Sequence, residues 1–479
     1  MTTLAMQSVV QTMMCGDEVK SCVLDMGYSM TRLGFGGHEM PRYSFRSDIG
    51  IKTGKSGSCG MDVDQKDDSA PSPAKKSRKS SSSSSSSKSK SNTPSSVPKN
   101  EKPLIGDSAL RFINDYTDIG RPFSFSGDGF PISINWDHVE SIMQYGFCDY
   151  MRIDPTDYCG YFTESHFATN LEKSKLFELA FERFEMPACY TMSNAALSSF
   201  SAGKPTSLII DYGASHTTVS PVVDGHVLNR AVCRTRRGGN WLDMSVQKEL
   251  KDRNVTIKPW FELDSHKGKY NPCSASLRAL HVDDIVRDVK KWMSFVPYQP
   301  IPAEKRVKFF DEVVKLPTYE LPDGSMISHS DTLCTGPEKF FIPADPAIGV
   351  KSIPRPQVNM PTYAQIDNID MEADSLQELI RASILRCDVD CRKDLLSNIS
   401  CVGGGAQIDG VVQRLEHEVK LLFPSSLKVK ANVQLPQERY NAAWIGASIL
   451  SICGSFQQIW ISKQEWLEYG DSLFAHRLK

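Results

Sequence analysis

The chain has 479 residues, 40% of them hydrophobic, and a formal net charge of −2 at pH 7. This length is sufficient for two or three domains with a sizeable core. No apolar run approaches the length of a membrane helix, and the first fifteen residues lack the basic start and cleavage site of a secretory signal. The 13 cysteines are scattered without a C-x-x-C pair, which indicates a reducing compartment. These features exclude a membrane or secreted protein and favour a cytosolic or nuclear one.

Apolar runs that look like strands alternate along the chain with helical patterns, which predicts an α/β architecture. The candidate strands, each ending at an Asp or Gly turn, are Ser21–Leu24, Leu208–Ile210 and Ile399–Val402. A helix with one apolar face is expected at about Leu376–Leu385, with Asp374 or Ser375 as its cap. A second helix follows Gly410, and Pro424 limits its end.

Residues 55–102 break this pattern, because they consist mainly of Ser, Lys, Pro and Asp with an unbroken serine run at 80–87. A segment with so few large apolar side chains is expected to be a disordered insertion. Residues 75–102 hold eight basic residues and one acidic residue, a net charge of +7, which leaves −9 on the rest of the chain. The acidic body is a poor nucleic-acid binder, so any attraction to DNA would come from the insertion. Its string at 75–79 (KKSRK) resembles a nuclear-import signal, although solvated linkers also collect lysines.

The most informative feature is an internal repeat. Asp25–Thr31 (DMGYSMT) and Asp211–Thr217 (DYGASHT) both read D-x-G-x-S-x-T, and each follows an apolar strand and leads into another. One such turn is common in proteins, but two copies in matched contexts indicate two similar lobes.

The residue types of the repeat suit the binding of phosphate. Glycine lets the backbone N–H groups of a turn approach an anion closely, and small hydroxyl side chains add donors. The aspartate at the end of each strand suits a hydrated Mg²⁺ that neutralises the phosphates. A third loop, Gly403-Gly404-Gly405, follows a strand and precedes a helix, where its N–H groups would also reach a nucleotide, although tight connections use glycine as well.

Together with the C-terminus, these residues resemble the actin family. The resemblance covers nearly the whole chain outside the insertion and parts of 240–315. Its longest motif is residues 455–466 (SFQQIWISKQEW), preceded by Trp444-Ile445-Gly446, and shorter matches lie at 135–137 (NWD), 319–324 (YELPDG), 387–390 (CDVD) and 392–395 (RKDL). The resemblance implies the α/β two-lobed fold of the actin, heat-shock chaperone and hexokinase superfamily.

The resemblance also implies a division of the chain. Residues 1–15 would be an N-terminal tail, and residues 16–201 with 441–479 the first lobe, with the insertion at 55–102 at its tip. Residues 202–440 would be the second lobe.

By the same resemblance, ATP and Mg²⁺ are the expected ligands, with Asp25 and Asp211 holding the metal through water. Arg32 replaces a lysine that reaches the phosphates, and Arg439 replaces a lysine near the adenine. The nucleotide-binding residues implied are Gly27, Tyr28, Ser29, Arg32, Gly213, Ala214, Ser215, Gly239, Arg287, Lys290, Gly403, Gly404, Gly405 and Arg439.

Several positions depart from the family pattern. Asn194 and Thr218 stand where actin has the glutamine and histidine that orient the attacking water, although His216 lies two residues before Thr218 and could partly compensate. Hydrolysis requires a water held in line with the terminal phosphate, so we expect no catalytic residue and little or no turnover, with slow residual ATPase activity at most. Ala214 replaces an aspartate of the second phosphate loop, Lys291 an acid that holds the ribose, and Ile408 a tyrosine beside the adenine.

Within the family, the sequence is most similar to nuclear actin-related subunits of chromatin-remodelling complexes (SWI/SNF-type and SWR-type) and histone acetyltransferase complexes. The matching segments are 211–227 and 16–19, together with the insertion between Gly50 and Asn135. The insertion would obstruct filament packing, and the filament plug of actin is unrecognisable near 341–350. The resemblance thus implies a nuclear transcription regulator that does not polymerise.

The expected partners follow from the same resemblance. They are an amphipathic helix of a remodelling ATPase or scaffold subunit, bound in an apolar groove, and an actin monomer. The basic insertion adds nucleosomes or DNA, and no membrane is expected. The alternative is an actin-type ATPase that forms cytoplasmic filaments. A sugar kinase is disfavoured by the actin-like C-terminus, since fold alone does not decide function.

Overall fold

The computed structural model describes residues 20–52, 102–111, 113, 117–125, 132–266, 273–302, 304–305, 318–328, 331–342 and 375–477. The N-terminal tail, segment 16–19, the import-like string, the insertion except Lys102, and residues 343–350 of the plug region lie outside these ranges. Predictions for those segments therefore stay predictions.

A six-stranded mixed sheet forms the centre of the first lobe, in the order β19-β10-β9-β1-β2-β3. β1 pairs with β2 in an antiparallel hairpin and with β9 in parallel, and β9 pairs in parallel with β10. The strands are β1 Ser21–Met26, β2 Met30–Phe35, β3 Tyr43–Arg46, β9 Cys159–Glu164, β10 Ala188–Ser193 and β19 Ile461–Ser462. The predicted strand Ser21–Leu24 is confirmed within β1.

The central sheet of the second lobe repeats this pattern, in the order β13-β12-β11-β17-β18, with β14 on β12. β11 pairs with β12 in an antiparallel hairpin and with β17 in parallel. The strands are β11 Ser207–Tyr212, β12 Thr217–Val223, β13 His226–Val227, β14 Cys233–Thr235, β17 Ile399–Val402 and β18 Ala431–Asn432. The other two predicted strands are thus confirmed, and the repeat seen in the sequence extends to the topology of two sheets.

Two helices join the sheets. α5 (Asn194–Ser201) follows β10, and α14 (Ala442–Ile452) comes after β18, packs against α5 and contacts β1 and β9. Trp444 of α14 is fully buried and donates its indole N–H to the carbonyl oxygen of Val23 at 3.2 Å. At the crossing of the helices, a Cβ on Gly446 would lie only 1.9 Å from the carbonyl oxygen of Leu197. The backbones therefore touch, and this contact fixes one sheet relative to the other.

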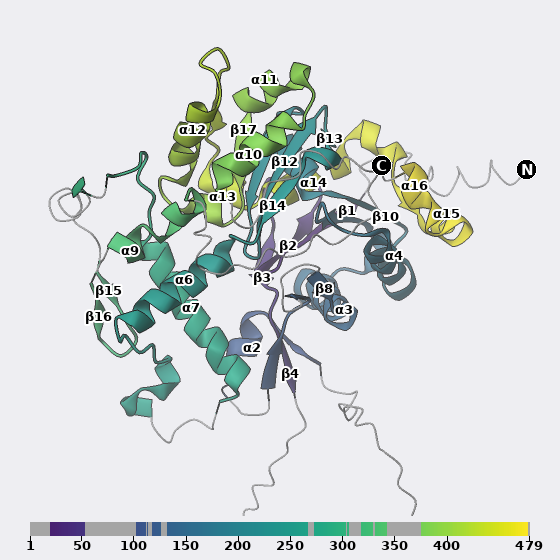
Figure 1. The fold of residues 1–479 in the computed structure, drawn as a ribbon. Coiled ribbons are helices and arrows are strands. Elements are labelled where there is room, and N and C mark those ends of the chain that lie inside the picture. The colour runs from purple at the N-terminus through teal and green to yellow at the C-terminus, as the bar shows by residue number, and fades with distance from the viewer. Residues whose placement is uncertain are drawn as a thin grey trace, which may run out of the picture.

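The second sheet is covered by the two helices that the sequence predicts. α10 (Leu376–Leu385) begins after Ser375, and α12 (Val411–Leu422) ends before Pro424. Their apolar faces pack with α11 (Val389–Ser397) into one core around β11 and β17. Figure 1 shows these helices gathered on β12 and β17.

The first sheet packs on an aromatic core that contains Phe147, Phe177, Phe181, Trp466 and Phe474. Phe177 meets Phe181 and Trp466 at a tilt and Phe474 edge-on, whereas Phe181 stacks on Trp466. Edge-on and offset-stacked contacts are the arrangements that aromatic quadrupoles favour. The covering elements are α3 Trp136–Gln144, the π-helical turns Tyr145–Met151 and Leu179–Arg183, α4 Asn170–Glu178, α15 Lys463–Tyr469 and α16 Ser472–Arg477.

A smaller unit extends each lobe past its sheet. After β3, a three-stranded sheet in the order β5-β4-β6 packs on Phe45 and Ile142. In the second lobe, α6 and α7 share a separate core with Leu321 and Leu333. The elements of the two units are α2 Asp107–Arg111, β4 Ile49–Lys52, β5 Leu104–Ile105, β6 Thr117–Gly120, β7 Phe123–Phe125, β8 Ile132–Ile134, α6 Gly239–Asp252, α7 Ala275–Met293, β15 Tyr319–Glu320, β16 Met326–Ile327 and α9 Asp331–Cys334.

These two units touch, because α7 lies beside β6. Short helical turns connect the larger elements, namely Pro155–Asp157, Asn229–Ala231, Trp260–Glu262, Asp264–His266, Gly336–Phe340, Gly405–Gln407, Gly454–Gln458 and α13 Pro436–Tyr440. Within the described ranges, no helix is both long and apolar enough to cross a membrane.

Replacing Gly446 by alanine tests the crossing of α5 and α14. The added methyl group would collide with the Leu197 carbonyl, so we expect a loss of about 3 kcal/mol in the free energy of unfolding, measured by thermal or urea denaturation. Gly454→Ala is the control, since a Cβ there meets no described atom within 4 Å. Equal stability of the two variants would contradict the account of the interface.

Candidate functional site

The two repeated turns have the same geometry. The Gly27 N–H donates to the carbonyl oxygen of Met30 at 2.9 Å. A Cβ on Gly27 would lie 2.9 Å from that oxygen, and a Cβ on Gly213 would lie 2.8 Å from the corresponding oxygen of His216. Neither turn accepts a side chain at this position without a shift of backbone. The strand register is also shared, since each aspartate pairs with the residue seven positions later, Arg32 or Thr218.

Asp25 and Asp211, the predicted metal carboxylates, end β1 and β11. Asp25 is 6% exposed, and its two carboxylate oxygens accept hydrogen bonds from Thr163 Oγ1 at 2.6 Å and Arg32 Nη1 at 2.9 Å. Burial raises the pKa of Asp211, the charge of Asp25 adds to the rise and Arg32 opposes it, so that the pKa is about 6. The carboxylates are therefore close enough to repel each other, and positive charge between them would relieve the repulsion.

A hydrated Mg²⁺ suits this pair, because hard oxygen ligands and uncompensated negative charge are what it prefers. Among the described residues, no group of three or more His, Cys, Asp or Glu could enclose a metal ion. Mg²⁺ held by these two aspartates would neutralise phosphate charge. One oxygen of Asp25 is already engaged by Arg32.

Arg32 lies inside the site but contacts protein groups rather than open space. Besides Asp25, it donates from Nε to Asn441 Oδ1 at 2.9 Å, and its Cζ lies 4.3 Å from the centroid of the Tyr440 ring. The sequence reasoning missed Tyr440, Asn441 and Thr163. Only the first two had a local signal, since they directly follow the predicted Arg439.

The third glycine loop packs against the second turn. Gly403 has φ +86°, and a Cβ there would lie 2.5 Å from Asp211 Oδ1. A Cβ on Gly405 would lie 2.8 Å from Cβ of Tyr212, whereas at Gly404 the nearest described atom belongs to the Tyr440 ring, 3.8 Å away. Arg439 braces the loop, since its carbonyl accepts from the Gly403 N–H at 2.9 Å and its Nη1 donates to the carbonyl of Ala406 at 2.8 Å. The structure therefore brings the loop and the Asp211 turn together.

The start of α6 closes the other side of the second turn. The N–H groups of Gly239 and Asn240 donate to the carbonyl oxygens of Gly213 and Ala214 at 2.9 and 2.7 Å. Ser215 Oγ lies 2.6 Å from Nδ1 of His216. Burial, aided by the charge of Arg234, lowers the pKa of His216 to about 4, so its ring is neutral at pH 7. His216 thus pairs with the phosphate turn rather than standing as a cation.

The predicted basic residues of α7 lie beside α6. Lys290 Nζ lies 2.5 Å from Asp243 Oδ1 and donates to the Gly239 carbonyl at 3.1 Å, and Arg287 Nε lies 3.4 Å from Asp243 Oδ2. Asp243 was missed by the sequence reasoning, because its partners are more than forty positions away along the chain. Asp243 therefore holds both basic side chains against α6, and Lys290 also contacts Gly239, whose N–H bonds the second turn.

The positions that depart from the family pattern differ in environment. The side-chain Oδ1 of Asn194, at the start of α5, is buried and has no hydrogen-bond partner among the described residues. Thr218 lies directly across from Asp211 in the β-hairpin. Lys291 is exposed, and Ile408 packs on the core of the second sheet. The buried Oδ1 of Asn194 is therefore an acceptor that a polar ligand or a water could satisfy.

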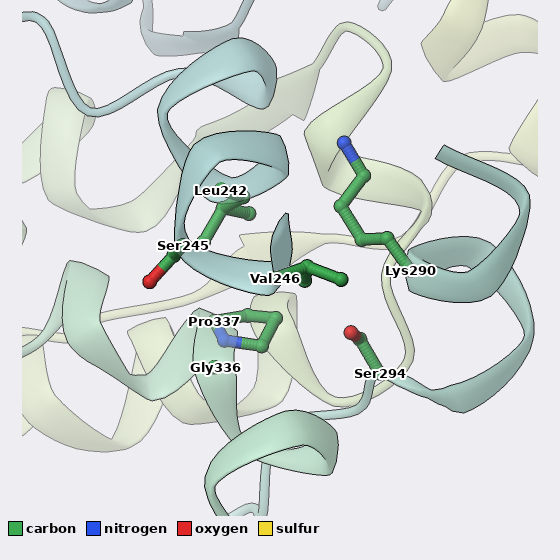
Figure 2. Close-up of a pocket in the computed structure, with 7 residues that line it drawn as sticks. All are labelled: Leu242, Ser245, Val246, Lys290, Ser294, Gly336 and Pro337. Carbon is green, nitrogen blue, oxygen red and sulfur yellow. The ribbon is translucent and has the colours of Figure 1, made fainter. Parts of the chain in front are cut away.

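A separate small cavity lies between α6, the C-terminal end of α7 and Pro337 (Figure 2). Its lining includes Lys290 and Ser294, whose Oγ is buried without a described partner. The cavity has room for about one water molecule, so it is not the nucleotide site.

The sequence is similar to those of known proteins. The family model described as Actin matches residues 16–479. A curated relative named actin-related protein 4, from Arabidopsis thaliana, is 32% identical over 96% of this chain and 99% of its own length. Proteins of the same name from Oryza sativa subsp. indica and Yarrowia lipolytica are each 30% identical over 96% of this chain, and the match covers 99% and 96% of their lengths. With the paired phosphate turns in two duplicated sheets, these matches show that the chain belongs to the actin family.

Proposed function

We propose that the protein is a non-polymerising structural subunit of nuclear chromatin-remodelling or histone acetyltransferase complexes, and that it binds Mg²⁺ and ATP with little or no hydrolysis. The observation that carries the proposal is the combination of two matched phosphate turns with Asn194 and Thr218 at the water-orienting positions. The similarity to relatives named actin-related protein 4 supports the actin-related part of this proposal.

ATP would lie between the turn at Gly27–Ser29 and the turn at Gly213–Ser215, with the third loop at 403–405 beside the second turn. Bound Mg²⁺ would supply positive charge to the phosphates near Asp25 and Asp211. Ligand that binds only the native state stabilises it by mass action, and this effect needs no turnover. The two central sheets support the proposed division into residues 16–201 with 441–479 and residues 202–440, because each sheet draws its strands from one of these parts.

The proposed loss of hydrolysis follows from the length and donor properties of two side chains. Asn194 is one methylene shorter than glutamine, and its Oδ1 is unpaired among the described residues. Thr218 has no imidazole, and the ring of His216, two residues earlier, is already hydrogen-bonded to Ser215. Without both orienting groups, a water near the terminal phosphate has no fixed line of attack.

Two exposed apolar side chains on α14 support the partner part of the proposal. Ile449 and Ile452 are 47% and 49% exposed, and residues three apart lie on one face of a helix. Such an apolar pair suits the non-polar face of an amphipathic helix from a remodelling ATPase or scaffold subunit. The actin monomer, DNA bound by the basic insertion, and a nuclear location belong to the same proposal.

Restoring the orienting groups tests the nucleotide part. The double variant Asn194→Gln, Thr218→His should hydrolyse bound ATP at least about tenfold faster than the wild type in single-turnover assays, since orienting and general-base groups contribute on this order or more. A triple variant that adds Gly213→Val is the control, because the valine side chain would collide with the His216 carbonyl and block the turn. Rapid hydrolysis by the wild type itself would contradict the proposal.

Replacing Ile449 by aspartate tests the partner part. A charge at the centre of an apolar contact should remove remodelling ATPase and acetyltransferase subunits from a nuclear-extract pull-down, while bound nucleotide is retained. Leu421→Asp on α12 is the matched control, since Leu421 is also strongly exposed and lies on another helix. Recovery of the same subunits with the Ile449 variant, or of none with the wild type, would count against the proposal.

A further inference from the structure

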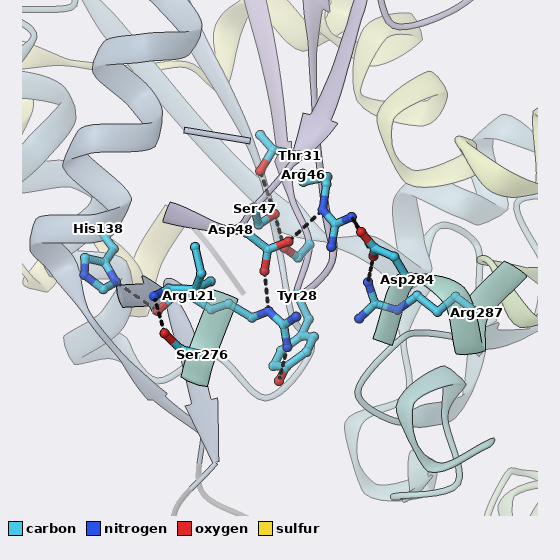
Figure 3. A network of polar contacts seen from close by, with 12 residues as sticks. Tyr28, Thr31, Arg46, Ser47, Asp48, Arg121, His138, Ser276, Asp284 and Arg287 are labelled. Atoms are coloured by element: carbon cyan, nitrogen blue, oxygen red, sulfur yellow. Dashed lines mark hydrogen bonds and ion pairs between the residues drawn. The ribbon is translucent and has the colours of Figure 1, made fainter. Parts of the chain in front are cut away.

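A chain of ion pairs crosses from the first lobe to the second (Figure 3). Arg46, at the end of β3, donates from Nη1 to both carboxylate oxygens of Asp284 on α7, at 2.7 Å each. The same arginine donates from Nε to Asp48 at 2.8 Å, and Asp48 also accepts from Arg121 Nε at 2.6 Å. The two acidic and two basic side chains alternate, so each charge has an opposite neighbour.

The side chains of these ion pairs are more buried than those of ordinary surface pairs. Asp48 is 3% exposed, and the side chains of Arg46 and Asp284 are 14% and 30% exposed. The hydrogen bonds and charges of Asp284 and Asp48 raise the pKa of Arg46 despite its burial. Partly buried pairs are screened less by salt than exposed ones, and separating them costs more.

The chain of ion pairs reaches both sides of the proposed nucleotide site. Arg121 donates from Nη1 to the hydroxyl of Tyr28, a residue of the first phosphate turn, at 3.2 Å. On the other side, Arg287 lies 3.4 Å from Asp284 and, through Asp243, joins Lys290 beside the second turn. Opening of the lobes would therefore break the Arg46–Asp284 contact, which links β3 to α7.

Neutral hydrogen bonds reinforce the same junction. Ser274, which caps α7, donates to the carbonyl of Thr117 at 2.5 Å. Ser276 Oγ accepts from the Ile119 N–H at 3.1 Å and donates to Asp118 at 3.0 Å. The amide of Ile119 is thus protected only while α7 stays docked on β6.

We propose that the Asp48–Arg46–Asp284 chain is an interlobe latch that holds the mouth of the nucleotide site closed and slows the release of bound nucleotide. Asp284 is its positioning residue, since it holds an arginine from each lobe. The effect on release rests on the proposed nucleotide binding, whereas closure of the lobes does not require it.

The test compares Asp284→Ala with the control Asp288→Ala. Asp288 lies one turn further along α7, and among the contacts described it accepts a hydrogen bond only from Tyr319 of its own lobe. Fluorescent etheno-ATP is bound to each full-length protein and chased with excess ATP. Release from Asp284→Ala should be at least about tenfold faster than from the wild type, as expected for the loss of a partly buried ion pair. High salt should speed release from the wild type more than from this variant. Equal release rates for all three proteins would overturn the latch.

A second measurement separates the latch from nucleotide binding. Hydrogen exchange of the Ile119 amide is followed in nucleotide-free protein. It should be faster in Asp284→Ala than in the wild type or Asp288→Ala. Unchanged exchange would overturn the latch even if nucleotide binds, while failure of the wild type to bind etheno-ATP would overturn only the proposed nucleotide binding.

Discussion

The site depends on the repulsion between Asp25 and Asp211, two carboxylates that the duplicated fold brings together at the ends of β1 and β11. Burial of Asp211, followed by the charge of Asp25, raises the pKa of Asp211 to about 6, so keeping both carboxylates ionised at this place costs free energy. Arg32 offsets part of that cost through its 2.9 Å contact with Asp25. A bound cation with its nucleotide would offset the remainder, so the repulsion between the two carboxylates favours cation binding.

The parts that were predictable from the sequence are those set by neighbouring residues. The two turns are encoded in seven-residue motifs, and their glycines are required by a carbonyl three positions later. The strand Ile399–Val402 and the helix Leu376–Leu385 were found with their bounds, because apolar periodicity and flanking turn residues define them locally. The repeat also predicted two similar lobes, and each of the two sheets holds one copy of it.

The remaining contacts join residues that are far apart in the chain. Arg32 and Asn441 are 409 positions apart, and Arg46 and Asp284 are 238 apart, so no local pattern links them. Arg32 was expected on the phosphates, and its pairing with Asp25 and Tyr440 depends on the packing of α14 against the first sheet. The same long-range packing explains why Asp243 and Thr163 were missed.

The account holds that the cleft retains ATP: the phosphate turns grip it, the latch slows its release, and the water-orienting groups are absent. The most direct test is to identify the nucleotide carried by the purified protein and to follow its terminal phosphate with time. The account predicts stoichiometric ATP that remains intact over many hours. Bound ADP with released phosphate, or no nucleotide in a folded protein that also fails to take up added ATP, would contradict it.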